Sequence, residues 1–130
     1  MESQAKIEEG FRKNIPSAAK TSIPNVITFS GNRNGMSDEE GARNTIAGLN
    51  RVKKIAEDNG VVICLELFNN KVDHKDYTCD HPAWRVNAVQ QVNSPNVRLL
   101  YDYHMQIMEG DLVRTITDRI QWIAHFRVIP

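Results

Sequence analysis

The sequence lacks an excess of charge of either sign, since its 130 residues include 16 lysines and arginines and 16 aspartates and glutamates. Proteins that hold nucleic acid by its phosphates usually present a basic surface, so we expect no nucleic-acid partner. It also lacks an apolar run of the roughly 20 residues that a membrane-spanning helix needs. Residues 1–11 carry acidic groups and no apolar core, unlike a signal peptide. We therefore expect a cytoplasmic protein that has no membrane partner.

Cysteine is scarce, and the two that occur, Cys64 and Cys79, are not arranged as C-x-x-C. That spacing argues against a zinc knuckle or a redox pair, and it predicts free thiols in a reducing compartment. The sequence also has no low-complexity tract or linker. Its length suits one domain, so we expect residues 1–130 to form a single domain.

Short apolar runs alternate with segments of helical periodicity along the whole chain. The apolar runs predict strands at residues 24–31, 61–69, 96–103 and 124–130. Helices are predicted between them at residues 2–20, 36–60, 79–94 and 109–123. Strands that alternate with helices form parallel sheets whose two faces are both covered. The sequence thus predicts an α/β fold with about four parallel strands.

Several residues mark the ends and the apolar faces of these helices. Ser37 with Glu40 three residues later is a capping box, and Gly60 stands where a helix commonly ends. Pro16 is expected to kink the first helix or to end a turn of it, and Pro82 to occupy a first turn after Asp80 as N-cap. Two apolar faces are predicted, one formed by Ile7, Phe11 and Ile15 and the other by Leu112, Ile116, Ile120 and Ile123.

Two carboxylates stand near the ends of consecutive predicted strands. Glu66 closes one apolar run and Asp102 closes the next, and burying such a group is costly unless it has a partner. The carboxyl ends of neighbouring parallel strands meet at one rim, where reactive groups gather in such folds. With His104 nearby, this rim predicts a hard-oxygen site for Mg²⁺ or Mn²⁺. Alternatively, each acid caps the following helix or pairs with a neighbouring lysine or arginine.

Three stretches, PNVITFSGNRNGMSDEEG, CLELFNNKVDHKDYTCDHPAW and LLYDYHMQIMEGDLVRTI, resemble the hydroxypyruvate isomerase family. That family belongs to the xylose-isomerase-like TIM barrels, together with ketose 3-epimerases and 2-oxo-tetronate isomerases. The resemblance covers about residues 11–126. It implies a partial (β/α)₈ barrel in which the four strands match the fourth to the seventh, so that the first three and the eighth are absent.

The resemblance also implies a chemistry, in which a proton moves between adjacent carbons of a small hydroxy-carbonyl substrate. Hydroxypyruvate and tartronate semialdehyde would interconvert through an enediolate that a divalent metal, Mg or Mn, stabilises as a Lewis acid. Glu66 matches the first acid/base Glu, which also touches the metal, and Asp102 matches a second metal ligand. His104 matches a substrate-contacting His. On the loops, Arg33 and Lys75 are predicted to contact the substrate.

The sequence departs from the family pattern at three points. The segment Asp102-Tyr103-His104 is one residue shorter than the family's, and a late catalytic Glu is missing. Arg127 stands where the family has a metal ligand, although a guanidinium stays protonated and cannot ligate a metal. These departures leave open an alternative, a catalytically inactive barrel fragment that acts as a structural or interaction module.

Two further expectations concern partners and relatives. A partial barrel has open sheet edges and uncovered apolar surface, which favour pairing with another chain, so a homo-oligomer is predicted. An apurinic endonuclease of the same superfamily is a less favoured alternative. Those enzymes hold several zinc ions with many histidines, and this sequence has four: His74, His81, His104 and His125.

Overall fold

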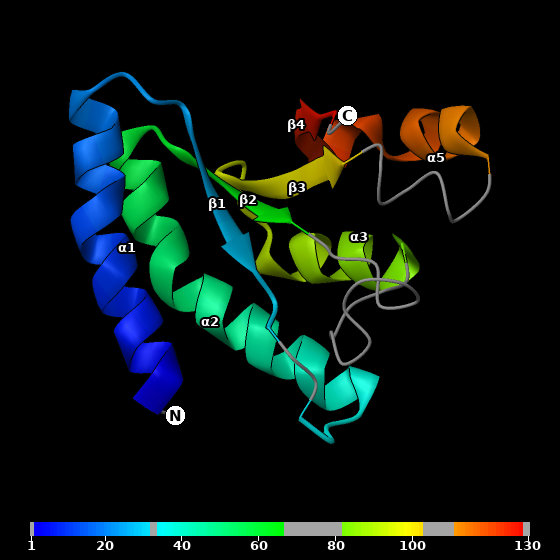
Figure 1. The fold of residues 1–130 in the computed structure, drawn as a ribbon, viewed down its shortest axis with the longest axis horizontal. Helices are drawn as coiled ribbons and strands as arrows, with labels where there is room; N and C mark the ends of the chain where they lie inside the picture. The colour runs from blue at the N-terminus through cyan, green and yellow to red at the C-terminus, as the bar shows by residue number, and fades with distance from the viewer. Residues whose placement is uncertain (1, 32–33, 67–81, 103–110, 129–130) are drawn as a thin grey trace.

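The computed structural model describes residues 2–31, 34–66, 82–102 and 111–128. It contains one four-stranded sheet in the order β1-β2-β3-β4, with every pair of neighbouring strands parallel. The strands are β1 (Asn25–Phe29), β2 (Val62–Glu66), β3 (Val97–Asp102) and β4 (Ile123–Arg127). The helices are α1 (Glu2–Lys20), α2 (Asp38–Asn59), α3 (Pro82–Val92), α5 (Leu112–Arg119) and the short 3₁₀ turn η2 (Ile120–Trp122). The predicted α/β alternation with four parallel strands is confirmed (Figure 1).

The main core lies between one face of the sheet and the helices α1, α2 and α3, which pack side by side (Figure 1). Helix α2 contributes Leu49, Val52 and Ala56, whose spacing places them on one stripe of the helix. Strands β2 and β3 contribute alternate residues to this face. The core residues are Ile15, Ala18, Leu49, Val52, Ala56, Val61, Ile63, Leu65, Val89, Val92, Val97 and Leu99.

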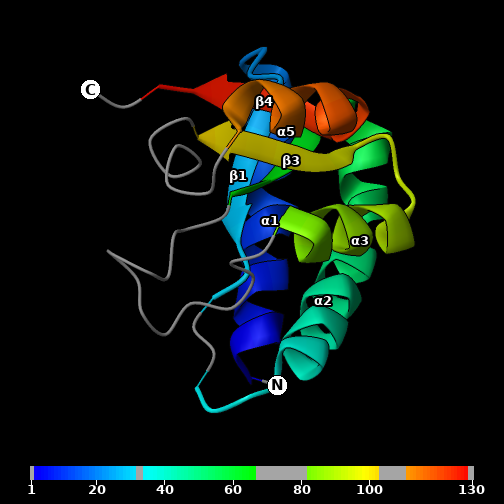
Figure 2. The same ribbon diagram turned by 90° about the vertical axis from the view of Figure 1, so that its right-hand side faces the viewer.

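The other face of the sheet is concave. Asn25 Nδ2 on β1 lies 3.5 Å from His125 Nδ1 on β4, although these are the two outermost strands of the sheet. In a flat sheet, three strand spacings would separate the two backbones by roughly 14 Å. The sheet is therefore curled like the wall of a barrel (Figure 2), and the residues on its concave face are brought toward one another.

The ends of helix α2 are capped as predicted. The Ser37 Oγ accepts a hydrogen bond from the Glu40 N–H at 3.2 Å, and Gly60 adopts the left-handed conformation with φ of 65°. Pro82 is the first residue of α3, as predicted, whereas Asp80 lies outside the described residues. None of the described helices is long and apolar enough to cross a membrane.

Helix α1 spans the predicted residues 2–20, with Pro16 inside it, and Ile15 and Ala18 on either side of the proline are held in the core. The predicted apolar faces fail at single positions, since Ile7 is 54% exposed and Ile120 is 53% exposed. Ile120 begins η2, and Ile123 already belongs to β4, so the regular helical spacing ends before them.

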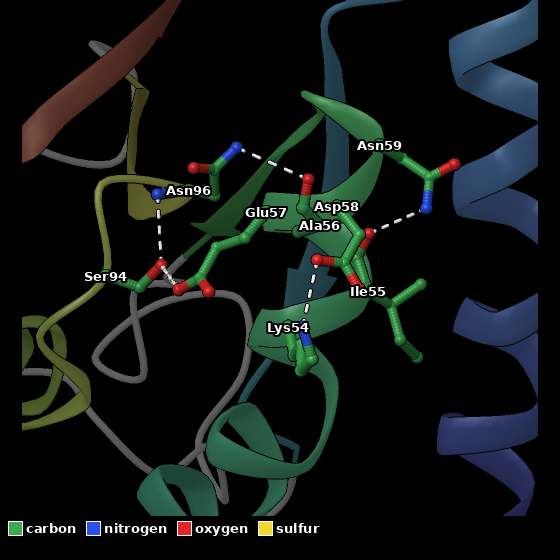
Figure 3. A network of polar contacts seen from close by, with 8 residues as sticks. All are labelled: Lys54, Ile55, Ala56, Glu57, Asp58, Asn59, Ser94 and Asn96. Atoms are coloured by element: carbon green, nitrogen blue, oxygen red, sulfur yellow. Dashed lines mark hydrogen bonds and ion pairs between the residues drawn. The ribbon is translucent and has the colours of Figure 1, made fainter.

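A polar network holds the amino-terminal ends of the strands, at the opposite end of β2 and β3 from Glu66 and Asp102. Ser94 Oγ donates to Glu57 Oε1 at 2.6 Å and accepts from the Asn96 N–H at 3.2 Å. Asn96 Nδ2 donates to the Val61 carbonyl at 2.9 Å. Figure 3 shows the bonds of Ser94 with Glu57 and Asn96. Together with the bond to Val61, they join the end of α2 to the beginnings of β2 and β3, so we read this end of the sheet as structural.

Candidate functional site

Three charged side chains meet at the carboxyl ends of neighbouring strands. Glu66 is the last residue of β2, Asp102 the last of β3 and Arg127 the last of β4. The side chains of Glu66 and Asp102 are each 1% exposed, whereas that of Arg127 is 35% exposed. The structure thus brings the two predicted carboxylates together at one rim, and it adds a cation to them.

The guanidinium of Arg127 bridges both carboxylates. Its Nη2 contacts Glu66 Oε1 and lies 3.0 Å from Asp102 Oδ2, and its Nε donates to the same Asp102 oxygen at 3.1 Å. A buried carboxylate is tolerated when it is paired and hydrogen-bonded. The alternative in which a strand-end acid pairs with a neighbouring arginine is therefore the arrangement present here, for both acids at once.

A bulge in the last strand aims Arg127 at this site. Leu99 pairs with Ile123, but Leu100 pairs with His125, so that Ala124 is the extra residue between them. In unbroken register, Asp102 would pair with Phe126 instead of Arg127. Because side chains alternate between the faces of a strand, the extra residue turns Arg127 onto the concave face, beside the two acids.

Burial raises the pKa of Glu66 above its ordinary value of 4.5. The positive charge of Arg127 and its hydrogen bond lower this pKa, while the negative charge of Asp102 raises it. Desolvation is the largest of these effects, so we take the net direction as upward. A carboxyl group whose pKa is shifted toward neutrality can both donate and accept a proton at the pH of the cell.

Directly below Glu66 and Asp102, the concave face carries two buried side chains that bear no charge. Cys64 and Leu100 lie two residues before Glu66 and Asp102 on the same face, and both are buried. Burial raises the pKa of the Cys64 thiol to about 11, so this side chain is a neutral, unreactive thiol at physiological pH. Cys64 is a free cysteine, as predicted, while Cys79 lies outside the described residues.

The residues present do not fit the predicted divalent metal. In the described ranges, no three His, Cys, Asp or Glu side chains are grouped so that they could hold a metal ion. More directly, Arg127 places a permanent positive charge at the point between the two carboxylates where a shared cation would bind. The assignment of Glu66 and Asp102 as metal ligands stays a prediction that this geometry does not support.

The remaining predicted site residues, Arg33, Lys75 and His104, lie outside the described residues. The sequence indicated only that Arg127 stands where the family has a metal ligand, and it did not predict a contact with the two acids. The pairing of Arg127 with both acids depends on the bulge at Ala124, and no residue type in the segment AHFR marks a bulge.

A separate cavity of about 500 Å³ lies between α1, β1 and α2. Its lining includes Ile7, Phe11, Phe29, Asn44 and Leu49, and it touches neither Glu66, Asp102 nor Arg127. It lies beside the half-exposed apolar residues of β1 and carries no constellation of groups suited to catalysis. We therefore place the candidate site at the rim and not in this cavity.

Comparison with known proteins identifies the family. The family described as xylose isomerase-like TIM barrel matches residues 2–128. Two curated relatives, from Mus musculus and Homo sapiens, carry the name "Putative hydroxypyruvate isomerase" and are each 24% identical over 131 residues. These alignments cover 96% of this chain and 47% of each relative, so the chain spans about half the length of the curated relatives it matches.

Solved structures show the same fold. The IolI protein with a binding zinc atom superposes with a TM-score of 0.85 at 18% identity, over 98% of this chain and 45% of that one. An AP endonuclease of family 2 from Brucella melitensis gives 0.76 at 26% identity, over 93% and 48%. D-psicose 3-epimerase with D-tagatose from Clostridium cellulolyticum H10 gives 0.78 at 19% identity, over 95% and 44%. The four strands thus correspond to part of a longer barrel.

Proposed function

Because this chain belongs to the xylose isomerase-like TIM barrel family, we propose that it forms part of an isomerase or epimerase that acts on a small hydroxy-carbonyl compound. Among such reactions we favour the interconversion of hydroxypyruvate and tartronate semialdehyde, which the names of the two curated relatives suggest. The observation that carries the proposal is the buried Glu66, whose pKa is raised at the carboxyl end of a barrel strand.

In the proposed reaction, Glu66 is the acid/base group. Its carboxylate accepts the proton from the carbon that bears the hydroxyl group, which leaves an enediolate. The same carboxyl then returns the proton to the adjacent carbon, while the hydroxyl proton passes to the former carbonyl oxygen, so that the carbonyl and the hydroxyl group exchange places. Asp102 holds the guanidinium of Arg127 in place, since it accepts a hydrogen bond from Nε and forms an ion pair with Nη2. Arg33, Lys75 and His104 are proposed to contact the substrate.

A ketose 3-epimerase would begin with the same removal of a carbon-bound proton, from a larger sugar, but the proton would return to the opposite face of the same carbon. The epimerase fold match keeps this reaction as the second candidate. A nucleic-acid substrate, which the name of the Brucella melitensis protein would suggest, is less favoured. With 16 basic and 16 acidic residues, the chain has no net charge to attract phosphates.

The test follows the substrate proton directly. Hydroxypyruvate is incubated with the purified chain in D₂O, and exchange of its carbon-bound protons is monitored by NMR together with product formation. We expect Glu66→Gln to slow enzyme-dependent exchange by roughly 100-fold or more, because the base is lost. Glu9→Gln, on the exposed surface of α1, serves as the matched control and should leave the rate unchanged.

An exchange rate that is the same with and without the protein would favour the alternative, an inactive structural or interaction module. Replacing hydroxypyruvate with a ketose tests the second candidate, since exchange at a ketose alone would favour an epimerase.

We also propose that two copies of the chain assemble into one closed barrel. In the described sheet, β1 and β4 each pair on one side only. Ile27 and Phe29 on β1 and Phe126 on β4 are exposed by 45%, 49% and 38%. Pairing β4 of each copy with β1 of the other would give eight parallel strands and would bury these side chains.

A further inference from the structure

We propose that Arg127 is the permanent cation of this site and that the site operates without a divalent metal. Nη2 of Arg127 contacts one oxygen of each carboxylate, Glu66 Oε1 and Asp102 Oδ2. A metal held between these two oxygens would need both of them at about 2.0–2.6 Å. The guanidinium and the metal therefore compete for one position.

The guanidinium is held firmly in this position. Asp102 Oδ2 accepts a hydrogen bond from Nε at 3.1 Å and forms an ion pair with Nη2 at 3.0 Å, and both acids are almost fully buried. Removing Arg127 from the site would take a paired cation away from two buried carboxylates, which is unfavourable. Entry of a metal would also place a divalent charge next to a guanidinium that cannot lose its proton.

A β-bulge in strand β4 makes this contact possible. The extra residue at Ala124 lets Asp102 pair with Arg127, whereas unbroken register would offer it Phe126. A bulge is a specific feature of a strand that re-aims a side chain. Here its effect is to bring a cation, and not an aromatic ring, to the two acids.

Arg127 retains the capacity to bind a ligand. Its Nε and Nη2 face the carboxylates, while Nη1 has no partner within the described parts of the chain, and the side chain is 35% exposed. Two N–H groups of a fixed cation can stabilise the oxygen of a carbonyl group or of an enediolate by hydrogen bonding. This electrophilic role rests on the function proposed above, whereas the exclusion of metal does not.

The experiment measures thermal unfolding of the full 130-residue chain with and without 1 mM Mn²⁺, for the wild type and four variants, one of which is Glu66→Gln. Arg127→His replaces the cation with a metal-binding imidazole, and Arg127→Lys keeps a positive charge. We expect no shift for the wild type or Arg127→Lys. For Arg127→His we expect Mn²⁺ to raise the midpoint by roughly 5 °C, and the double variant Arg127→His/Glu66→Gln should lose this rise.

Two results would overturn the proposal. The first is a Mn²⁺-dependent rise in the wild type that is lost in Glu66→Gln, because the metal would then displace Arg127. The second is a folded Arg127→His variant that gains no rise, since Arg127 would then not be what excludes the metal. If Arg127→His does not fold, the wild-type and Arg127→Lys measurements still show whether Mn²⁺ binds while a positive charge occupies the site.

The proposed function is tested apart from this inference. If hydroxypyruvate exchange is present, we expect it to survive dialysis against EDTA with its rate unchanged. If exchange is absent, the isomerase assignment fails, but the Mn²⁺ measurements still decide whether Arg127 keeps the metal out.

Discussion

The carboxyl of Glu66 links the pH of the solution to the stability of the fold. Its pKa is raised in the folded chain, chiefly by burial, so the folded state binds this proton more tightly than the unfolded state does. The contribution of Glu66 to stability is therefore fully present below its ordinary pKa of 4.5. It is lost as the pH rises through the folded-state pKa.

Comparing the wild type with Glu66→Gln makes this visible, because the amide stays neutral at every pH. We expect the two proteins to be most similar in free energy of unfolding near pH 4. As the pH rises toward 8, the free energy of unfolding of the wild type should fall relative to that of the Gln variant. Urea unfolding at several pH values measures this difference in free energy, with Glu9→Gln as an exposed control. A difference that moves in the opposite direction would mean that Arg127 outweighs burial and lowers the pKa.

The sequence was enough to predict that Glu66 and Asp102 lie at one rim, but not that Arg127 contacts both of them. Glu66 and Asp102 could be located because each closes an apolar run, and consecutive parallel strands must end at one rim. The contact of Arg127 depends on one extra residue in β4. Since a shift of one residue exchanges the two faces of a strand, no pattern of residue types could tell Arg127 from Phe126 as the neighbour of Asp102.

At the level of the helix, the cap of α2 makes a measurable contribution. Ser37 Oγ accepts the Glu40 N–H at 3.2 Å, which satisfies one of the free donors of the first turn. We expect Ser37→Ala to lower the free energy of unfolding by about 1 kcal/mol. Ser37→Asp, which keeps an acceptor at the same place, should stay close to the wild type. Equal losses in the two variants, measured by urea unfolding, would contradict the capping role.

The same scale shows where helix and strand rules work and where they fail. Ser37, Gly60 and Pro82 act through local backbone chemistry, so their sequence signals were enough to place the ends of helices. Pro16 is accommodated inside α1, where the neighbouring Ile15 and Ala18 are buried and tertiary packing outweighs the local cost of a proline. Ile7 was predicted to lie on the apolar face of its helix because of its spacing, but it lines the open cavity beside β1.

At the scale of the whole molecule, the open edges of the concave sheet lead to a prediction about self-association. Ile27 lies on the outermost strand β1, pairs in register with Cys64 on the concave face and is 45% exposed. If two copies close an eight-stranded barrel, Ile27 enters an apolar interior at the junction. A lysine there would bury an unpaired charge, which costs several kcal/mol. We therefore expect Ile27→Lys to weaken self-association at least tenfold.

Size-exclusion chromatography with light scattering across a range of concentrations measures this directly. The wild type should show twice the mass of one chain, and Ile27→Lys should shift to a monomer at concentrations where the wild type stays paired. Val113→Lys is the matched control, because Val113 is 73% exposed on α5, away from both edge strands, and should associate like the wild type. A wild type that remains monomeric at high concentration would mean that another chain, or none, covers the edges β1 and β4.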